Sequence, residues 1–324
     1  MKLTYSLLAA AFACGLASAQ TTAYTTPVGY VTQTLGQNYN LIGLTVHQPT
    51  IAAGVIDAES TSSVTDNEVN FGTLLTAGAS YVLELGDGTI QEITAWSGSV
   101  LTTPEDITAN ITPGTTTYKL RKASTISDVF GATNSAGLSP DTDGSLTGTD
   151  TVLVLNAAGN FETIYYFNDG AGTTGWFDDQ GGEAANRRII YADGFYVKRA
   201  SATPLNLVIS GEIKTTKTGG ALVSGFNYVG SVAPVGLTLG TSGLEAYLAP
   251  DSDGSFTGTD LLYILQGGTL YTAYYFNDGA GTTGWFDDQG GDATNLKLEG
   301  GFLIKAASGP KPYVLNVPAT YGSL

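Results

Sequence analysis

The sequence predicts an all-β protein made of small β-sandwich or barrel-like modules with an internal duplication. Short apolar runs rich in β-branched and aromatic residues recur between clusters of turn-forming residues, for example at 152–155 and 261–265. The 43 glycines suit many tight turns, and no amphipathic helical stripe exceeds two turns. Residues 165–182 recur letter for letter at 274–291, which indicates a duplicated unit.

Composition limits the classes of function. The chain is 42% hydrophobic and only 13% charged, so apolar residues suffice for a core while Thr, Ser, Asn and Gly must supply much of the surface. The 13 Lys and Arg residues against 29 Asp and Glu residues give a net charge of -16. Such a charge repels phosphate backbones and anionic headgroups. The sequence therefore predicts no nucleic-acid partner.

Residues 1–19 are predicted to be a secretory signal peptide. Met1-Lys2 is a basic start, residues 7–16 are apolar, and residues 17–19 form a small-x-small cleavage pattern. Cys14, the only cysteine, would leave with this segment, so the mature chain is expected to lack disulfides and thiol chemistry. No later segment has 18 uninterrupted apolar residues, which predicts no membrane-spanning segment after cleavage. The expected location is extracellular or on the outer cell surface.

An N-terminal β module is predicted over residues 20–125. Strands are expected at 40–46 and at 81–85, the second followed by a Gly-Asp-Gly turn at 86–88. His47, the only histidine, follows the first of these strands. A lone histidine there predicts a structural or exposed side chain, and any His-dependent catalytic triad would have to include it.

Two repeat modules are predicted after it, over residues 126–218 and 219–324. The similarity extends beyond the identical segments, because the acidic stretch at 140–150 is matched at 250–260. Self-similarity of this length indicates a duplicated domain rather than a solenoid of shorter units.

Each eighteen-residue segment predicts a β-hairpin with aromatic side chains beside acids. In one interpretation, the rings form a stacking platform for sugars and the acids hydrogen-bond sugar hydroxyls. In the other, the rings fill a core and the Asp and Gly residues form the turn; alternation along a strand requires some of the rings to be core in either case. The candidate ligand-binding residues are Tyr165, Tyr166, Trp176, Asp178 and Asp179, with Tyr274, Tyr275, Trp285, Asp287 and Asp288 in the second copy.

The acidic loops at 139–150 and 249–260 resemble a twelve-residue calcium loop. Acids occupy positions 3, 5 and 12, and glycine occupies position 6. Position 1 is Ser139 or Ala249 instead of Asp, and no flanking helices are visible, so an ordinary Asp-Gly turn is the alternative. Calcium is the only cofactor that the sequence suggests. Its candidate ligands are Asp141, Asp143, Asp150, Asp251, Asp253 and Asp260.

No catalytic residues are predicted. Paired carboxylates for glycoside hydrolysis stay open, because the separation of two acids in space is invisible in a sequence. A cluster duplicated within one chain nevertheless favours multivalent binding or repetitive packing over a single catalytic site.

Several segments together resemble an uncharacterised family of secreted, β-rich bacterial proteins known mainly from verrucomicrobial genomes. The segments that carry the resemblance are 27–31, 40–44, 118–122, 129–134, 150–155, 165–176 and 194–199. The resemblance spans residues 27 to about 200, and it implies export and a β-rich fold. It implies no activity.

The sequence thus favours an exported, non-enzymatic protein of the cell surface or extracellular matrix with a structural or adhesive role. The expected partners are further copies of the chain or a cell-surface or extracellular polysaccharide. A carbohydrate-binding protein that uses the duplicated aromatic hairpins is the alternative, and a glycan-acting hydrolase is a further one.

Overall fold

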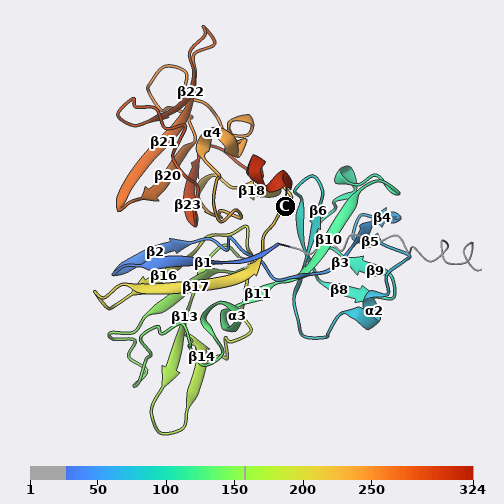
Figure 1. Ribbon diagram of the computed structural model, residues 1–324, viewed down its shortest axis with the longest axis vertical. Coiled ribbons are helices and arrows are strands. Elements are labelled where there is room, and N and C mark those ends of the chain that lie inside the picture. The colour runs from blue at the N-terminus through green and yellow to red at the C-terminus, as the bar shows by residue number, and fades with distance from the viewer. Residues whose placement is uncertain (1–26, 157, 324) are drawn as a thin grey trace, which may run out of the picture.

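The computed structural model describes residues 27–156 and 158–323, and it confirms the all-β class. Strands make up 44% of the chain and helices 8%. The strands form three bodies, which we call sandwich A (residues 28–42 and 124–212), the insert (residues 50–122) and sandwich B (residues 218–323) (Figure 1). Among the described residues, no helix is long and apolar enough to cross a membrane. The predicted signal peptide lies outside the described residues.

Sandwich A packs a five-stranded antiparallel sheet, in the order β14-β13-β12-β16-β2, against the β1–β17 ribbon. Side chains alternate along each strand, so every second one enters the core between these layers. Leu35 and Leu207 from the ribbon meet Val152 and Val197 from the sheet there. Its elements are β1 (Val28–Leu35), β2 (Asn38–Ile42), β11 (Ser124–Thr125), α3 (Ile126–Phe130), β12 (Thr151–Leu155), β13 (Phe161–Asn168), β14 (Thr174–Asp178), β15 (Arg188–Ile189), β16 (Phe195–Arg199) and β17 (Leu205–Glu212).

Within the described residues, sandwich B repeats the five-stranded sheet and the two-stranded ribbon of sandwich A, without counterparts of β11 and β15. Its sheet has the order β19-β23-β20-β21-β22, and the β18–β24 ribbon covers one face. Its elements are β18 (Thr218–Leu222), β19 (Gly225–Gly230), α4 (Leu239–Ser242), η3 (Leu244–Ala246), β20 (Leu261–Gln266), β21 (Thr269–Asn277), β22 (Thr283–Asp287), β23 (Gly301–Ala306), β24 (Lys311–Leu315) and η4 (Ala319–Ser323).

The duplication in space is longer than the similarity in sequence, because it includes β1 and β2. These strands pair with β17 and β16, as β18 and β19 pair with β24 and β23. Asn40 and Asn227 also make the same bonds: Nδ2 donates to three backbone carbonyls, and Oδ1 accepts from the N–H four residues earlier. Residues 28–42 fall within the N-terminal module predicted over 20–125, yet they pair with the first repeat. The division into separate folding units stays a prediction.

The insert joins β2 to β11 and packs two four-stranded sheets, β3-β10-β6-β7 and β4-β5-β9-β8, around Phe71, Leu101 and Leu120. Strand β6 is buried on both faces, because Leu83 enters this core while Val82 enters the core of sandwich A. The elements of the insert are β3 (Thr50–Val55), β4 (Ala58–Ser60), β5 (Ser63–Thr65), α2 (Phe71–Leu74), β6 (Tyr81–Leu85), β7 (Ile90–Ile93), β8 (Ala95–Ser97), β9 (Val100–Thr102), η2 (Thr108–Asn110) and β10 (Thr117–Lys122).

The two sandwiches meet through equivalent surfaces. Gly43, which follows β2, and Gly230, which ends β19, occupy equivalent positions, and a Cβ on Gly43 would lie 2.9 Å from the Gly230 Cα. The Cβ on Gly43 would also clash with the carbonyl oxygen of Gly300. In the same way, a Cβ on Gly230 would lie 3.0 Å from the carbonyl oxygen of Asp193, which is the residue equivalent to Gly300. Reciprocal contact between like surfaces is the signature of a two-fold interface. The two sandwiches are therefore arranged as a fused pseudo-dimer.

Replacing Gly43 by alanine should lower the free energy of unfolding by about 1–3 kcal/mol, because the added methyl group overpacks this contact. Urea denaturation followed by circular dichroism measures the change. Gly29→Ala in β1 is the matched control, since its Cβ would have no neighbour nearer than 3.8 Å. Equal stability of the two variants would contradict the proposed close approach of the sandwiches.

Candidate binding pocket and the predicted sites

The carboxylates that begin the acidic loops are bound by the backbone of their own loops. Asp141 Oδ2 accepts a hydrogen bond from Gly144 N at 2.7 Å, and Oδ1 accepts one from Leu146 N at 3.1 Å. Asp251 makes both bonds at the same distances in the second copy. These carboxylates therefore hold the turn.

The carboxylate that ends the first loop, Asp150, fastens it to the sheet. It is fully buried, and it accepts hydrogen bonds from Ser139 N at 2.8 Å and Ala200 N at 2.7 Å. Its Oδ2 also forms an ion pair with Arg199 Nε at 2.9 Å. Asp150 thus joins both ends of the loop to the end of β16.

The second copy keeps this arrangement with a cation from another strand. Asp260 is also fully buried and forms an ion pair with Lys311 of β24. The position of Arg199 is held by Ala306 in sandwich B, so the compensating charge arises on a different strand. The preserved requirement is a cation beside the buried carboxylate.

All six candidate calcium ligands are thus bonded to other groups of the chain. Asp143 and Asp253 are exposed, and each accepts a hydrogen bond from a backbone N–H two residues later. Over residues 27–156 and 158–323, no three His, Cys, Asp or Glu side chains are grouped closely enough to hold a metal ion. Calcium binding stays a prediction.

The tryptophans of the duplicated hairpins lie in the cores. Trp176 is 2% exposed and Trp285 is 4% exposed, and Trp176 Nε1 donates to Gly131 O at 2.8 Å. Tyr166 and Tyr275 pack beside them, with ring centroids 5.2 Å apart in both copies. The expected stacking platform therefore lacks its indole rings, because alternation along β14 and β22 turns them inward.

The other candidate ligand-binding residues do not form one surface with the tryptophans. Tyr274 is buried beneath Phe256, with ring centroids 4.8 Å apart, whereas Tyr165 is half-buried. The Asp178 and Asp287 carboxylates accept backbone N–H groups in the turn that follows each hairpin. Of the candidate ligand-binding acids, Asp179 and Asp288 are exposed.

The outer edges of the duplicated hairpins are also occupied. Ala184 N donates to Trp176 O at 2.8 Å, and Ala293 N donates to Trp285 O at 3.0 Å. The segment after each hairpin thus folds back along β14 or β22. Self-association through these two strand edges would have to displace those bonds.

A buried ion cluster joins the insert to sandwich A. The Glu84 carboxylate lies 2.7 Å from Arg121 Nε and 3.0 Å from Lys214 Nζ, and it accepts a hydrogen bond from the Tyr191 hydroxyl at 2.7 Å. Arg121 Nη2 also lies 2.6 Å from Glu212 Oε1. This cluster was not predicted from the sequence, although Glu84 is a lone charge within the apolar run 81–85.

The cluster is ionised and balanced. Burial by itself raises the pKa of Glu84, but the charges of Lys214 and Arg121 outweigh burial and hold that pKa at about 2. Burial lowers the pKa of Lys214 even though Glu84 opposes the shift. Because two carboxylates face two cations, with Glu212 as the second carboxylate, the cluster stabilises the junction only when it is complete.

His47 packs against this cluster and should make the protein acid-sensitive. Burial lowers the pKa of His47 to about 4, and its ring lies 4.6 Å from that of Tyr191, near Glu84, Lys214 and Arg121. The unfolded chain binds a proton near pH 6.5 and the folded chain does not, so stability is lost as the pH falls from 6.5 towards 4. We expect this residue to contribute a loss of about 2–3 kcal/mol between pH 7 and pH 4.

Urea denaturation at several pH values measures the contribution of His47. The His47→Gln variant is the control, since glutamine does not titrate in this range. A His47→Gln variant with the same slope of stability against pH as the wild type would contradict the prediction.

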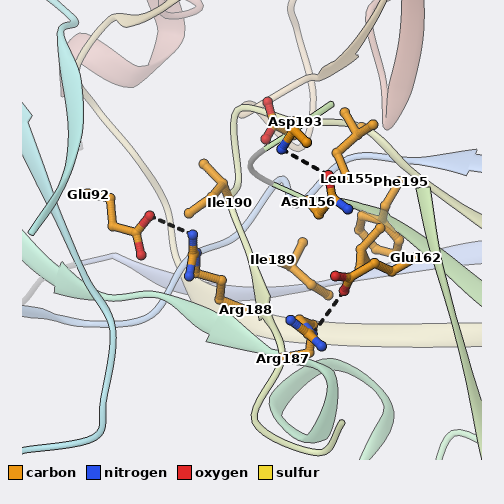
Figure 2. Close-up of a pocket in the computed structure, with 13 residues that line it drawn as sticks. Glu92, Leu155, Asn156, Glu162, Arg187, Arg188, Ile189, Ile190, Asp193 and Phe195 are labelled. Carbon is orange, nitrogen blue, oxygen red and sulfur yellow. Dashed lines mark hydrogen bonds and ion pairs between the residues drawn. The ribbon is translucent and has the colours of Figure 1, made fainter. Parts of the chain in front are cut away.

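A pocket lies between Glu92 of the insert and sandwich A (Figure 2). It encloses about 520 Å³. Arg188 of β15 faces Glu92 of β7, with Nη2 and Oε2 2.9 Å apart, and Arg187 Nε lies 3.1 Å from Glu162 Oε2. Ile189, which follows the two arginines, is buried and contributes to the apolar lining.

This pocket was not predicted from the sequence, because the residues that line it are far apart in the chain. A signal was nevertheless present, since Arg187 and Arg188 are replaced by Leu296 and Lys297 in an otherwise similar second copy. Ion-paired guanidinium and carboxylate groups around an apolar floor are suited to binding a polar ligand by hydrogen bonds.

Comparison of the chain with protein-family models, with curated proteins and with solved structures finds no match.

Proposed function

We propose that the chain is an exported, non-enzymatic protein of the cell surface or extracellular matrix with a structural or adhesive role. The observation that supports this best is that several of its carboxylates are buried and bonded inside the protein. Asp141, Asp150 and Glu84, together with the second-copy acids Asp251 and Asp260, are buried and engaged in internal bonds. General acid–base catalysis needs a group that can reach a substrate, and these groups are enclosed.

The arrangement of the modules supports the same proposal. A buried ion cluster fastens the insert to sandwich A, and glycines bring sandwich B into backbone contact with sandwich A. Such junctions favour a rigid body that displays surfaces at fixed positions. A rigid body of this kind suits a role in adhesion or in the build-up of an extracellular layer.

Exposed apolar side chains on the outer sheet faces supply surfaces for contact. Tyr39 is 57% exposed and Phe226, at the equivalent position in sandwich B, is 52% exposed. Leu265 and Leu270 are paired across β20 and β21, and they are 59% and 62% exposed. Clustered apolar exposure of this kind is typical of interaction surfaces.

The proposal is tested with the mature chain, residues 20–324. Size-exclusion chromatography and negative-stain microscopy report self-assembly, and co-sedimentation with washed envelopes of the source cells reports attachment. We expect ordered assemblies or wash-resistant attachment. A monomer that stays unassembled at high concentration and does not sediment with envelopes would overturn the proposal.

A further inference from the structure

We propose that the pocket between the insert and sandwich A binds a short neutral oligosaccharide segment. This inference rests on the proposed adhesive function, for which it supplies the ligand class and the site. Ligand pockets are commonly found where domains meet, and about 520 Å³ lies within the usual range of their volumes.

The polar groups of the pocket match the hydrogen bonding of sugar hydroxyls. The side chains of Arg187 and Arg188 are 38% and 41% exposed, and those of Glu162 and Glu92 are 25% and 28% exposed. A guanidinium carries five N–H donors, and the ion pairs use only some of them. A hydroxyl donates and accepts, so it can bond to the guanidinium and carboxylate of one pair simultaneously.

The charge balance favours a neutral ligand over an anion. Arg188 already faces Glu92, and Arg187 lies between Glu162 and Asp178, at 3.1 and 3.5 Å. The exposed Asp193 also lines the pocket. An anionic ligand would have to compete with these carboxylates for the arginines, whereas a polyol adds bonds without displacing them.

The second copy shows that the fold does not need these polar residues. Tyr271, Leu296 and Lys297 occupy the positions of Glu162, Arg187 and Arg188 in sandwich B, although the neighbouring eighteen residues are identical. Sandwich B also has no insert at the position that supplies Glu92. The polar set is therefore specific to sandwich A and is not required for the packing of this sheet.

This internal comparison provides the test variant. Glu162→Tyr, Arg187→Leu and Arg188→Lys, combined in the full mature chain, give sandwich A the residues that sandwich B already contains. Wild type and variant are compared on an array of neutral oligosaccharides such as cellohexaose, xylohexaose and mannohexaose, followed by calorimetry with the tightest binder. We expect the variant to bind at least about tenfold more weakly, as for loss of hydrogen bonds to charged groups.

Two further variants make the test specific. Tyr271→Glu, Leu296→Arg and Lys297→Arg in sandwich B should leave affinity unchanged, because that site has no insert wall. Glu92→Gln keeps the shape of the pocket and should weaken binding several-fold. Thermal melts establish that each variant is folded.

The proposal is overturned if the triple variant in sandwich A binds as the wild type does. It is also overturned if no neutral oligosaccharide binds, or if only polygalacturonate or inorganic phosphate binds. Envelope attachment and self-assembly are scored separately. Attachment without oligosaccharide binding would therefore reject the pocket proposal alone, whereas loss of both attachment and assembly would reject the proposed function.

Discussion

Replacing Arg121 by methionine should lower the free energy of unfolding by about 3–5 kcal/mol, because it leaves two buried carboxylates without their shared cation. Arg121 is 1% exposed and lies within 2.7 Å of both Glu84 and Glu212. Among the described residues, Lys214 would then be the single ion-pair partner of Glu84, and the Glu212 carboxylate would keep only its bonds to Thr50. Urea denaturation monitored by near- and far-ultraviolet circular dichroism measures the loss.

Two controls separate this effect from general damage to β10. Lys119→Met lies on the same strand and removes a charge that forms no ion pair within the described residues, so it should change stability by less than about 0.5 kcal/mol. Combining Glu84→Gln with Arg121→Met should cost less than the two single losses together, because each removes the charge that the other leaves unpaired. A loss below 1 kcal/mol for Arg121→Met alone would show that the cluster does not hold the junction.

The all-β class and the duplication were predictable because both depend on local patterns. Short β-rich runs between turn clusters are visible without knowledge of the partner strands. The eighteen-residue identity reports a duplicated unit directly. The pairing of β2 with β16 was not predictable in the same way, because Tyr196 and its partner Leu41 are separated by the whole insert.

The aromatic hairpins show a second limit of sequence reasoning. Alternation predicts that Trp176 and Phe177 point to opposite faces, but it does not say which face is the core. The packing of α3 decides this in the first copy, because the Phe130 ring lies 5.8 Å from the Trp176 ring and Trp176 Nε1 donates to Gly131 O. The core interpretation therefore holds for the indole rings of both copies.

The pocket and the ion cluster were beyond prediction for a related reason. Each brings together side chains from the insert and from sandwich A, such as Glu92 with Arg188 and Glu84 with Tyr191. Pairs of this kind depend on how two modules dock, and neither module's own pattern encodes that. Comparison of the two copies helps, because positions that differ between otherwise similar repeats identify residues with a role in only one of them.

Replacing Asp150 by alanine should also lower the free energy of unfolding by about 3–5 kcal/mol, because Arg199 would then be a buried cation without its carboxylate. Arg199 is 5% exposed, and the loop would lose the two backbone bonds that join it to Ser139 and Ala200. The loss should be the same with calcium and with chelator, since Arg199 and two backbone N–H groups already bind the Asp150 carboxylate. Thermal and urea unfolding under both conditions measure it.

Asp143→Ala is the control that distinguishes loop closure from calcium binding. Asp143 is exposed and bonds only within the tip of its own loop, so its removal should leave stability unchanged if the loop is a structural turn. A calcium site would behave differently, because it needs six to eight oxygen ligands and each carboxylate would count. Chelator would then lower the melting temperature of the wild type, and Asp143→Ala would reproduce much of that shift. Such a result would assign the acidic loops to a metal, whereas dependence on Asp150 alone would assign them to the buried ion pair.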